Sequence, residues 1–130
     1  MEKTVVHTDR APAPFRGAPY SQAIALGDFV FVSGQLPLEP ASGGVVGTTI
    51  QEQTEQVFAN IRAILDAAGS GLDRLVKTTV FLTTLADFPG MNEVYRRHVG
   101  DRPPARSTVP VGAFPDGALV EIEAIAHAGR

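Results

Sequence analysis

The sequence predicts an α+β fold in which a mixed β-sheet carries two helices on one face. Short runs rich in β-branched and aromatic residues are typical of strands. Two longer stretches place apolar residues at helical spacing, which predicts amphipathic helices. Clusters of glycine and proline separate these segments. The order is a short strand, a hairpin, a helix, a strand, a helix and two final strands, and amphipathic helices cover a sheet on one side.

The N-terminal third is predicted to form strands. Thr4–Val6 is a short β-branched run, and the proline-rich segment Asp9–Pro19 is a loop. Ile24–Leu26 and Phe29–Val32 flank a two-residue Gly-Asp turn, which predicts a hairpin. Gly34, just beyond it, either permits close approach of another group or marks a bulge.

The first helix has clear end signals. It is predicted to begin at Thr48, because Thr48 with Gln51, or Thr49 with Glu52, fits a capping box. Gly69 is placed to end the helix in the left-handed conformation.

The C-terminal half predicts a strand, a helix and two strands. Arg74–Thr84 is β-branched, and Asp87 is expected to cap a second helix that Gly100 ends. The run beginning at Arg106 and the run Leu119–Ala126 complete the sheet.

Bulk composition excludes several classes of protein. The 130 residues are expected to form one domain, residues 1–130. The formal net charge is −3 and no basic block occurs, so no nucleic-acid partner is expected. The N-terminal residues lack the apolar core of a signal peptide and no run is long enough to span a membrane, so a cytoplasmic protein is expected.

Several catalytic chemistries are also excluded. There is no cysteine, which removes thiol nucleophiles and thiolate metal sites. No Gly-x-Ser-x-Gly elbow surrounds Ser33. The three histidines lack metal-ligand spacing, so no metal is expected.

The runs around Arg106 and Glu121 hold the best candidates for a site. If the two runs pair as a hairpin about Phe114–Gly117, Arg106 and Thr108 lie on the same sheet face as Glu121 and Glu123. An ordinary arginine–glutamate pair on a solvated face is the alternative.

These residue types also suit a pocket for a small carboxylate. The planar guanidinium of Arg106 can bind a carboxylate bidentately. Glu121 can orient or deprotonate a water, and the hydroxyls of Tyr20 and Ser33 can fix other polar atoms.

Five segments resemble the RidA (YjgF) family in order and spacing, and the resemblance extends from about Ala18 to the C-terminus. They are Tyr20-Ser21-Gln22-Ala23, Val32-Ser33-Gly34-Gln35, Val76-Lys77-Thr78-Thr79-Val80-Phe81-Leu82, Pro104-Ala105-Arg106-Ser107 and Glu121-Ile122-Glu123-Ala124-Ile125-Ala126.

The resemblance implies a chorismate-mutase-like (YjgF-like) fold and a homotrimer whose sheets form a central barrel, with clefts between subunits. In those clefts Arg106 would bind the substrate carboxylate and Glu121 would position the attacking water. Tyr20, Ser33 and Gly34 would line the cleft. Thr108 stands where several members carry cysteine, so it is expected to contribute through its backbone.

The reaction implied is hydrolytic deamination of enamine and imine intermediates, such as 2-aminoacrylate and 2-iminopropanoate, to 2-oxo acids and ammonia. That makes the chain a 2-iminobutanoate/2-iminopropanoate deaminase-type hydrolase that needs no cofactor. Two alternatives remain: a pathway-specific enamine deaminase, and a carboxylate-binding or chaperone-like trimer without turnover.

Overall fold

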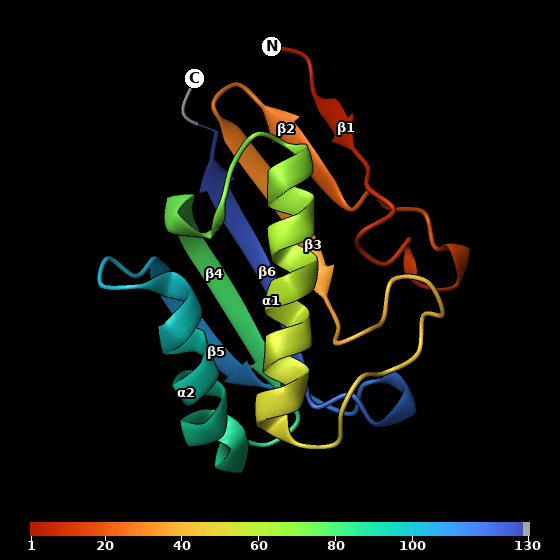
Figure 1. Ribbon diagram of the computed structural model, residues 1–130, viewed down its shortest axis with the longest axis vertical. Coiled ribbons are helices and arrows are strands. Elements are labelled where there is room, and N and C mark those ends of the chain that lie inside the picture. Colours follow the sequence, from red (N-terminus) through yellow and green to blue (C-terminus); the bar gives the residue numbers. More distant parts are fainter. Residues whose placement is uncertain (129–130) are drawn as a thin grey trace.

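A computed structural model describes residues 1–128, in which a single six-stranded sheet is covered on one face by two helices (Figure 1). The α+β class predicted from the sequence is confirmed. The strands are β1 (Thr4–Val6), β2 (Ala23–Leu26), β3 (Phe29–Gln35), β4 (Leu75–Leu82), β5 (Ala105–Pro110) and β6 (Val120–His127), the helices α1 (Ile50–Ala67) and α2 (Phe88–Val99), and the 3-10 turns η1 (Phe15–Gly17), η2 (Leu72–Arg74), η3 (Leu85–Asp87) and η4 (Pro115–Gly117).

The strand order in the sheet is β1-β2-β3-β6-β4-β5. Strands β4 and β5 are parallel, because α2 connects them as a crossover, and all other neighbours are antiparallel. The predicted hairpin between the Arg106 and Glu121 runs is therefore wrong. The crossover places β5 on the outer edge of β4, so β6 pairs with the opposite edge of β4 and with β3.

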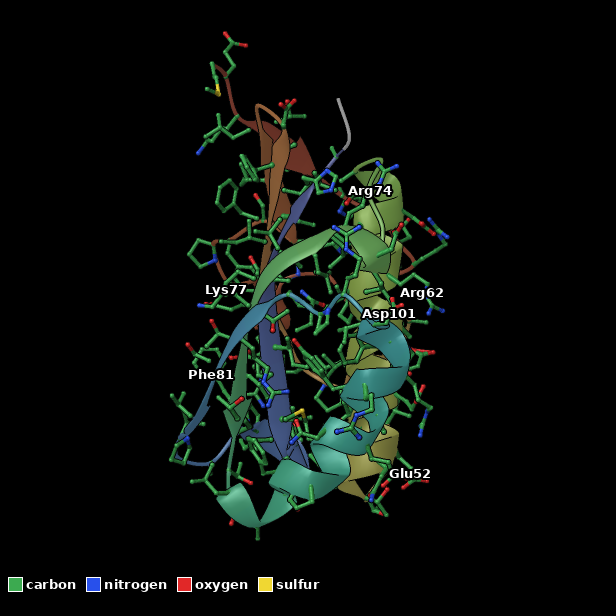
Figure 2. The ribbon with its side chains drawn as sticks, turned by 90° about the vertical axis from the view of Figure 1, so that its left-hand side faces the viewer. Glu52, Arg62, Arg74, Lys77, Phe81 and Asp101 are labelled. Carbon is green, nitrogen blue, oxygen red and sulfur yellow. The ribbon has the colours of Figure 1, made fainter. Side chains whose placement is uncertain are left out.

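The two helices and the sheet form two layers, with the core between them. Figure 2 shows both helices on one side of the sheet, and Lys77 and Phe81 on the other side. Val80 and Ile122 of the sheet and Phe58 and Ile61 of α1 are fully buried in that core. The opposite sheet face is uncovered and carries exposed aromatic side chains from β3, namely Phe29 and Phe31.

The predicted end signals mark both helices, although α1 begins at Ile50 rather than at Thr48. Thr49 is the N-cap of α1: the Glu52 backbone N–H donates to Thr49 Oγ1 over 3.1 Å, and Thr49 N–H donates to Glu52 Oε1 over 3.1 Å. Gly69 follows α1 with a φ of 77°. Asp87 occupies the predicted N-cap position of α2, but its side chain makes no capping hydrogen bond; one turn earlier, Thr84 Oγ1 accepts from the Ala86 N–H at the start of η3. Gly100 is the C-cap of α2 with a φ of 73°, as predicted.

Replacing Thr49 by alanine should destabilise the protein by about 1 kcal/mol, because one end of the capping box loses its acceptor. Urea unfolding at fixed protein concentration measures this. Thr48→Ala is the matched control, since only the Thr48 backbone contacts Glu52. Equal losses in both variants would contradict the cap assignment.

Candidate active site

Arg106 and Glu121 lie on opposite faces of the sheet within one chain. Arg106 pairs with Thr78 of β4, whereas Glu121 pairs with Phe81. Paired residues share a face and neighbours alternate. Thr78 is fully buried toward the helices, and Phe81 lies on the uncovered face (Figure 2). The expectation that both groups share a face is wrong, because the register on β4 places Arg106 beside Thr78 and Glu121 beside Phe81, three residues further along that strand.

The guanidinium of Arg106 is held by one face of α2. Arg106 Nη1 donates to Asn92 Oδ1 over 2.8 Å. The guanidinium carbon lies 4.7 Å from the Tyr95 ring centroid and 5.4 Å from that of Phe88, within cation–π range. Tyr95 is fixed in turn by a 2.6 Å hydrogen bond between its hydroxyl and that of Thr78. Arg106 therefore has a defined orientation without using an acidic partner.

A shallow pocket of about 690 Å³ lies beside this guanidinium. Its walls come from α2 and from the connector into β5, and include Asn92, Tyr95, Pro103 and Pro104. Among residues 1–128, no ion pair to Arg106 is formed. The guanidinium of Arg106 is thus available to bind the carboxylate of a ligand.

Glu121 lies in a second pocket, of about 610 Å³. Burial raises the pKa of the Glu121 carboxyl, and the negative charge of Glu123 raises it further. No other described side chain bonds to the Glu121 carboxylate. A half-buried carboxyl with a raised pKa is typical of groups that transfer protons in a site.

Gly34 allows the Glu121 side chain to occupy its position. A Cβ on Gly34 would lie only 2.8 Å from Glu121 Cδ and 3.0 Å from Oε2. The β3–β6 register also shifts between Val32 and Gln35. Both interpretations of this glycine are therefore confirmed, since it marks a bulge and admits a neighbouring group.

Tyr20 and Ser33 line the same pocket, but their hydroxyls also bind backbone groups. Ser33 Oγ donates to the Ser21 carbonyl over 2.6 Å, and Tyr20 Oη accepts from the Phe15 N–H over 2.6 Å. Each hydroxyl oxygen keeps a further lone pair. The structure thus brings together Tyr20, Ser33, Gly34 and Glu121.

Thr108 lies apart from those four residues. It pairs with buried Val80, so its side chain points to the helix-covered side, as does that of Arg106. Its Oγ1 is buried and has no hydrogen-bond partner among the described residues.

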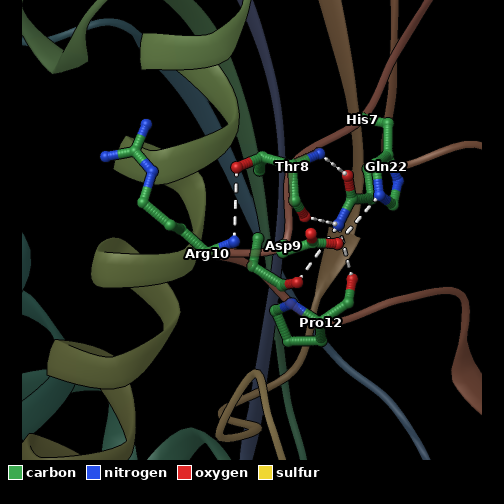
Figure 3. A network of polar contacts seen from close by, with 7 residues as sticks. His7, Thr8, Asp9, Arg10, Pro12 and Gln22 are labelled. Atoms are coloured by element: carbon green, nitrogen blue, oxygen red, sulfur yellow. Dashed lines mark hydrogen bonds and ion pairs between the residues drawn. The ribbon is translucent and has the colours of Figure 1, made fainter.

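Two further polar residues shape the site and were missed by the sequence analysis. Gln22 is 2% exposed and binds the preceding loop (Figure 3). Its Nε2 donates to the carbonyls of Thr8, Ala11 and Pro12 over 3.0, 3.2 and 2.8 Å, and its Oε1 accepts from the Thr8 N–H over 2.8 Å. Pro12 is part of the Glu121 pocket wall, so Gln22 fixes that wall.

Asn92 is the second missed residue. It lies four residues after Phe88 and three before Tyr95, which is the spacing of one helix face. That spacing can be detected in the sequence. It does not predict a contact between Asn92 and Arg106, however, unless β5 is known to lie beside α2.

Two negative findings concern the described part of the chain. Residues 1–128 contain no group of three or more histidine, aspartate or glutamate side chains placed to hold a metal ion. In the same range, neither helix is long and apolar enough to cross a membrane.

Residues 8–128 match the family described as Endoribonuclease L-PSP. RutC family protein PYRAB12510 of Pyrococcus abyssi is 49% identical over 98% of each chain. Reactive Intermediate Deaminase A, chloroplastic, of Arabidopsis thaliana is 46% identical over 97% of this chain and 66% of its own length. The 2-iminobutanoate/2-iminopropanoate deaminase of Capra hircus is 41% identical over 99% of this chain and 93% of its own.

Solved structures of similar proteins have the same fold as this chain. RidA from an Antarctic Psychrobacter superimposes with a TM-score of 0.89 and 43% identity, covering 95% of this chain and 98% of that chain. A Thermotoga maritima protein superimposes with a TM-score of 0.90 and 48% identity over 98% of each chain. The chain belongs to the Endoribonuclease L-PSP family, which includes proteins named RutC and RidA.

Glu121 should make stability depend on pH in a defined direction. Because its pKa is raised in the folded protein, wild type loses stability as the pH rises from the ordinary carboxyl value of 4.5 through the folded value. Glu121→Gln removes that loss. Its stability advantage over wild type should therefore grow as the pH rises above about 4.5, while staying below about 1 kcal/mol because the group is only half-buried.

Urea unfolding at several pH values measures this difference. Glu123→Gln should act in the same direction but less strongly, since it removes one of the two causes of the raised pKa. A Glu121→Gln advantage that shrinks as the pH rises would contradict the assignment.

Proposed function

We propose that this protein hydrolyses small 2-imino acids and their enamine tautomers, of the 2-aminoacrylate/2-iminopropanoate type, to 2-oxo acids and ammonia. The observation that carries the proposal is the half-buried carboxyl of Glu121, with its raised pKa and no side-chain partner among the described residues, in a pocket of ligand size. The deaminase names of relatives 41% and 46% identical to this chain support it.

We further propose that the reactive cleft forms between copies of the chain in a homotrimer. Arg106 and Glu121 lie on opposite sheet faces, so one copy supplies them to two different places. In the trimer, the Arg106 side of one copy would face the Glu121 pocket of the next. The exposed rings of Phe29 and Phe31 on the uncovered sheet face support burial of that face against other copies.

The proposed cleft has to bind one carboxylate and activate one water for hydrolysis of the imine. Arg106 binds the substrate carboxylate, and Glu121 accepts a proton from a water as the water oxygen bonds to the imine carbon. The π electrons of the C=N bond move to nitrogen, which takes the proton held by Glu121, and a carbinolamine forms. Glu121 then takes the proton of the carbinolamine hydroxyl and passes it to nitrogen as the C–N bond breaks and the C=O bond forms. Ammonia leaves and the 2-oxo acid remains. The imine carbon is already electrophilic, so orientation of one water suffices and no cofactor is required.

The substrates are reactive intermediates of the kind that pyridoxal-phosphate enzymes release, so we place the reaction in the cytoplasm beside such enzymes. Thr108, on the same strand face as Arg106, is proposed to border the carboxylate end of the cleft. The competing function is a trimer that binds small carboxylates without turnover.

The Arg106→Ala variant should lose about 30- to 150-fold in kcat/KM, because one charge-assisted contact is worth roughly 2–3 kcal/mol. The assay generates imines with an amino-acid oxidase and follows their capture by semicarbazide, which competes with the protein. Arg102→Ala, at an exposed neighbouring site, is the matched control and should keep full activity. If wild type never lowers semicarbazone formation, the hydrolase proposal fails and the binding function takes its place.

A further inference from the structure

The Glu121 pocket is larger and more apolar than a three-carbon substrate requires. Its volume is about 610 Å³. A six-atom imino acid such as 2-iminopropanoate needs only on the order of 200 Å³, at the ~30 Å³ that one water-sized group occupies in the liquid. Beyond the polar groups already described, the walls are aromatic and aliphatic, with Phe15, Leu36, Leu38, Phe81, Phe114 and Pro115.

Two of the aromatic walls come from a pair of 3-10 turns. Phe15 begins η1, and Phe114 directly precedes η4. Both rings belong to half-buried residues, so they are neither packed into the core nor fully solvated. They come from distant parts of the chain and line the same pocket.

These turns contain the two non-glycine residues with positive φ in the described chain. Arg16 has a φ of 52° and Asp116 a φ of 57°. Such conformations cost on the order of 1 kcal/mol each and tend to occur at functional sites. Arg16 Nη2 and Asp116 Oδ2 lie 3.8 Å apart, so an ion pair joins the two turns in an adjoining hollow that both residues line.

We propose that Phe15 and Phe114 form a subsite for a bulky apolar side chain on the substrate. The inference rests on the proposed function and specifies its substrate class, namely imino acids derived from amino acids such as leucine or phenylalanine. A water held by Glu121 must lie about 3–3.5 Å from the imine carbon before attack. The side chain on that carbon therefore starts beside Glu121, in the same pocket, and extends toward its apolar walls.

The test compares imines of different size in the semicarbazide competition assay. Wild type should favour the leucine-derived imine over the alanine-derived one by about 10-fold or more in kcat/KM, which is the scale of apolar pocket discrimination. Phe15→Ala and Phe114→Ala should each reduce hydrolysis of the leucine-derived imine by about 10-fold and change the alanine-derived imine less than about threefold. The conservative Phe15→Leu and Phe114→Leu variants should retain most of the preference.

Activity on the alanine-derived imine reports that each variant is folded and has an intact reaction centre. Calorimetric titration with the stable products, 4-methyl-2-oxopentanoate against pyruvate, gives a readout independent of turnover, and wild type should bind the larger product more tightly. A wild type that prefers the alanine-derived imine, or variants that lower both imines equally, would overturn the subsite while leaving the proposed function standing. Failure to hydrolyse any imine would overturn both.

Discussion

The position of β4 between β5 and β6 is the constraint on which the rest of the account depends. Its two neighbours carry Arg106 and Glu121, the two residues to which the proposed function assigns the main roles. The crossover through α2 makes β5 parallel to β4, and β6 then has only the other edge of β4 to pair with. The register turns Arg106 toward the helices and Glu121 toward the uncovered face. A single copy therefore holds two half-sites that do not face each other.

Each half-site is organised by its own neighbours. On the helix side, Asn92 and the ring of Tyr95 hold the Arg106 guanidinium without neutralising it. On the other side, Gly34 makes room for the Glu121 carboxyl, and burial keeps the pKa of that carboxyl high. The Arg106 half-site is suited to bind a negatively charged group, and the Glu121 half-site is suited to proton transfer. In the proposed trimer, a second copy packed on the uncovered sheet face would let the halves meet.

The sequence predicted the elements better than it predicted their pairing. Periodicity and capping signals are local, so the first hairpin, the Thr49 cap and both helices could be found. Strand order depends on long-range pairing, and the apparent turn at Phe114–Gly117 suggested a hairpin that does not form. The cluster of Tyr20, Ser33 and Glu121 came from family resemblance, and spacing could not have placed these residues together. Asn92 was missed because its role exists only once α2 packs beside β5.

The central claim is that the cleft takes Arg106 from one copy and Glu121 from another, and subunit mixing tests it most directly. Arg106→Ala and Glu121→Gln are each expected to be nearly inactive alone. Unfolded together in equal amounts and refolded into mixed trimers, they should recover about a quarter of wild-type imine hydrolysis, since both intact residues then meet in about one cleft in four. A mixture that stays as inactive as its components, although size-exclusion and mass measurements show mixed trimers, would contradict the shared cleft.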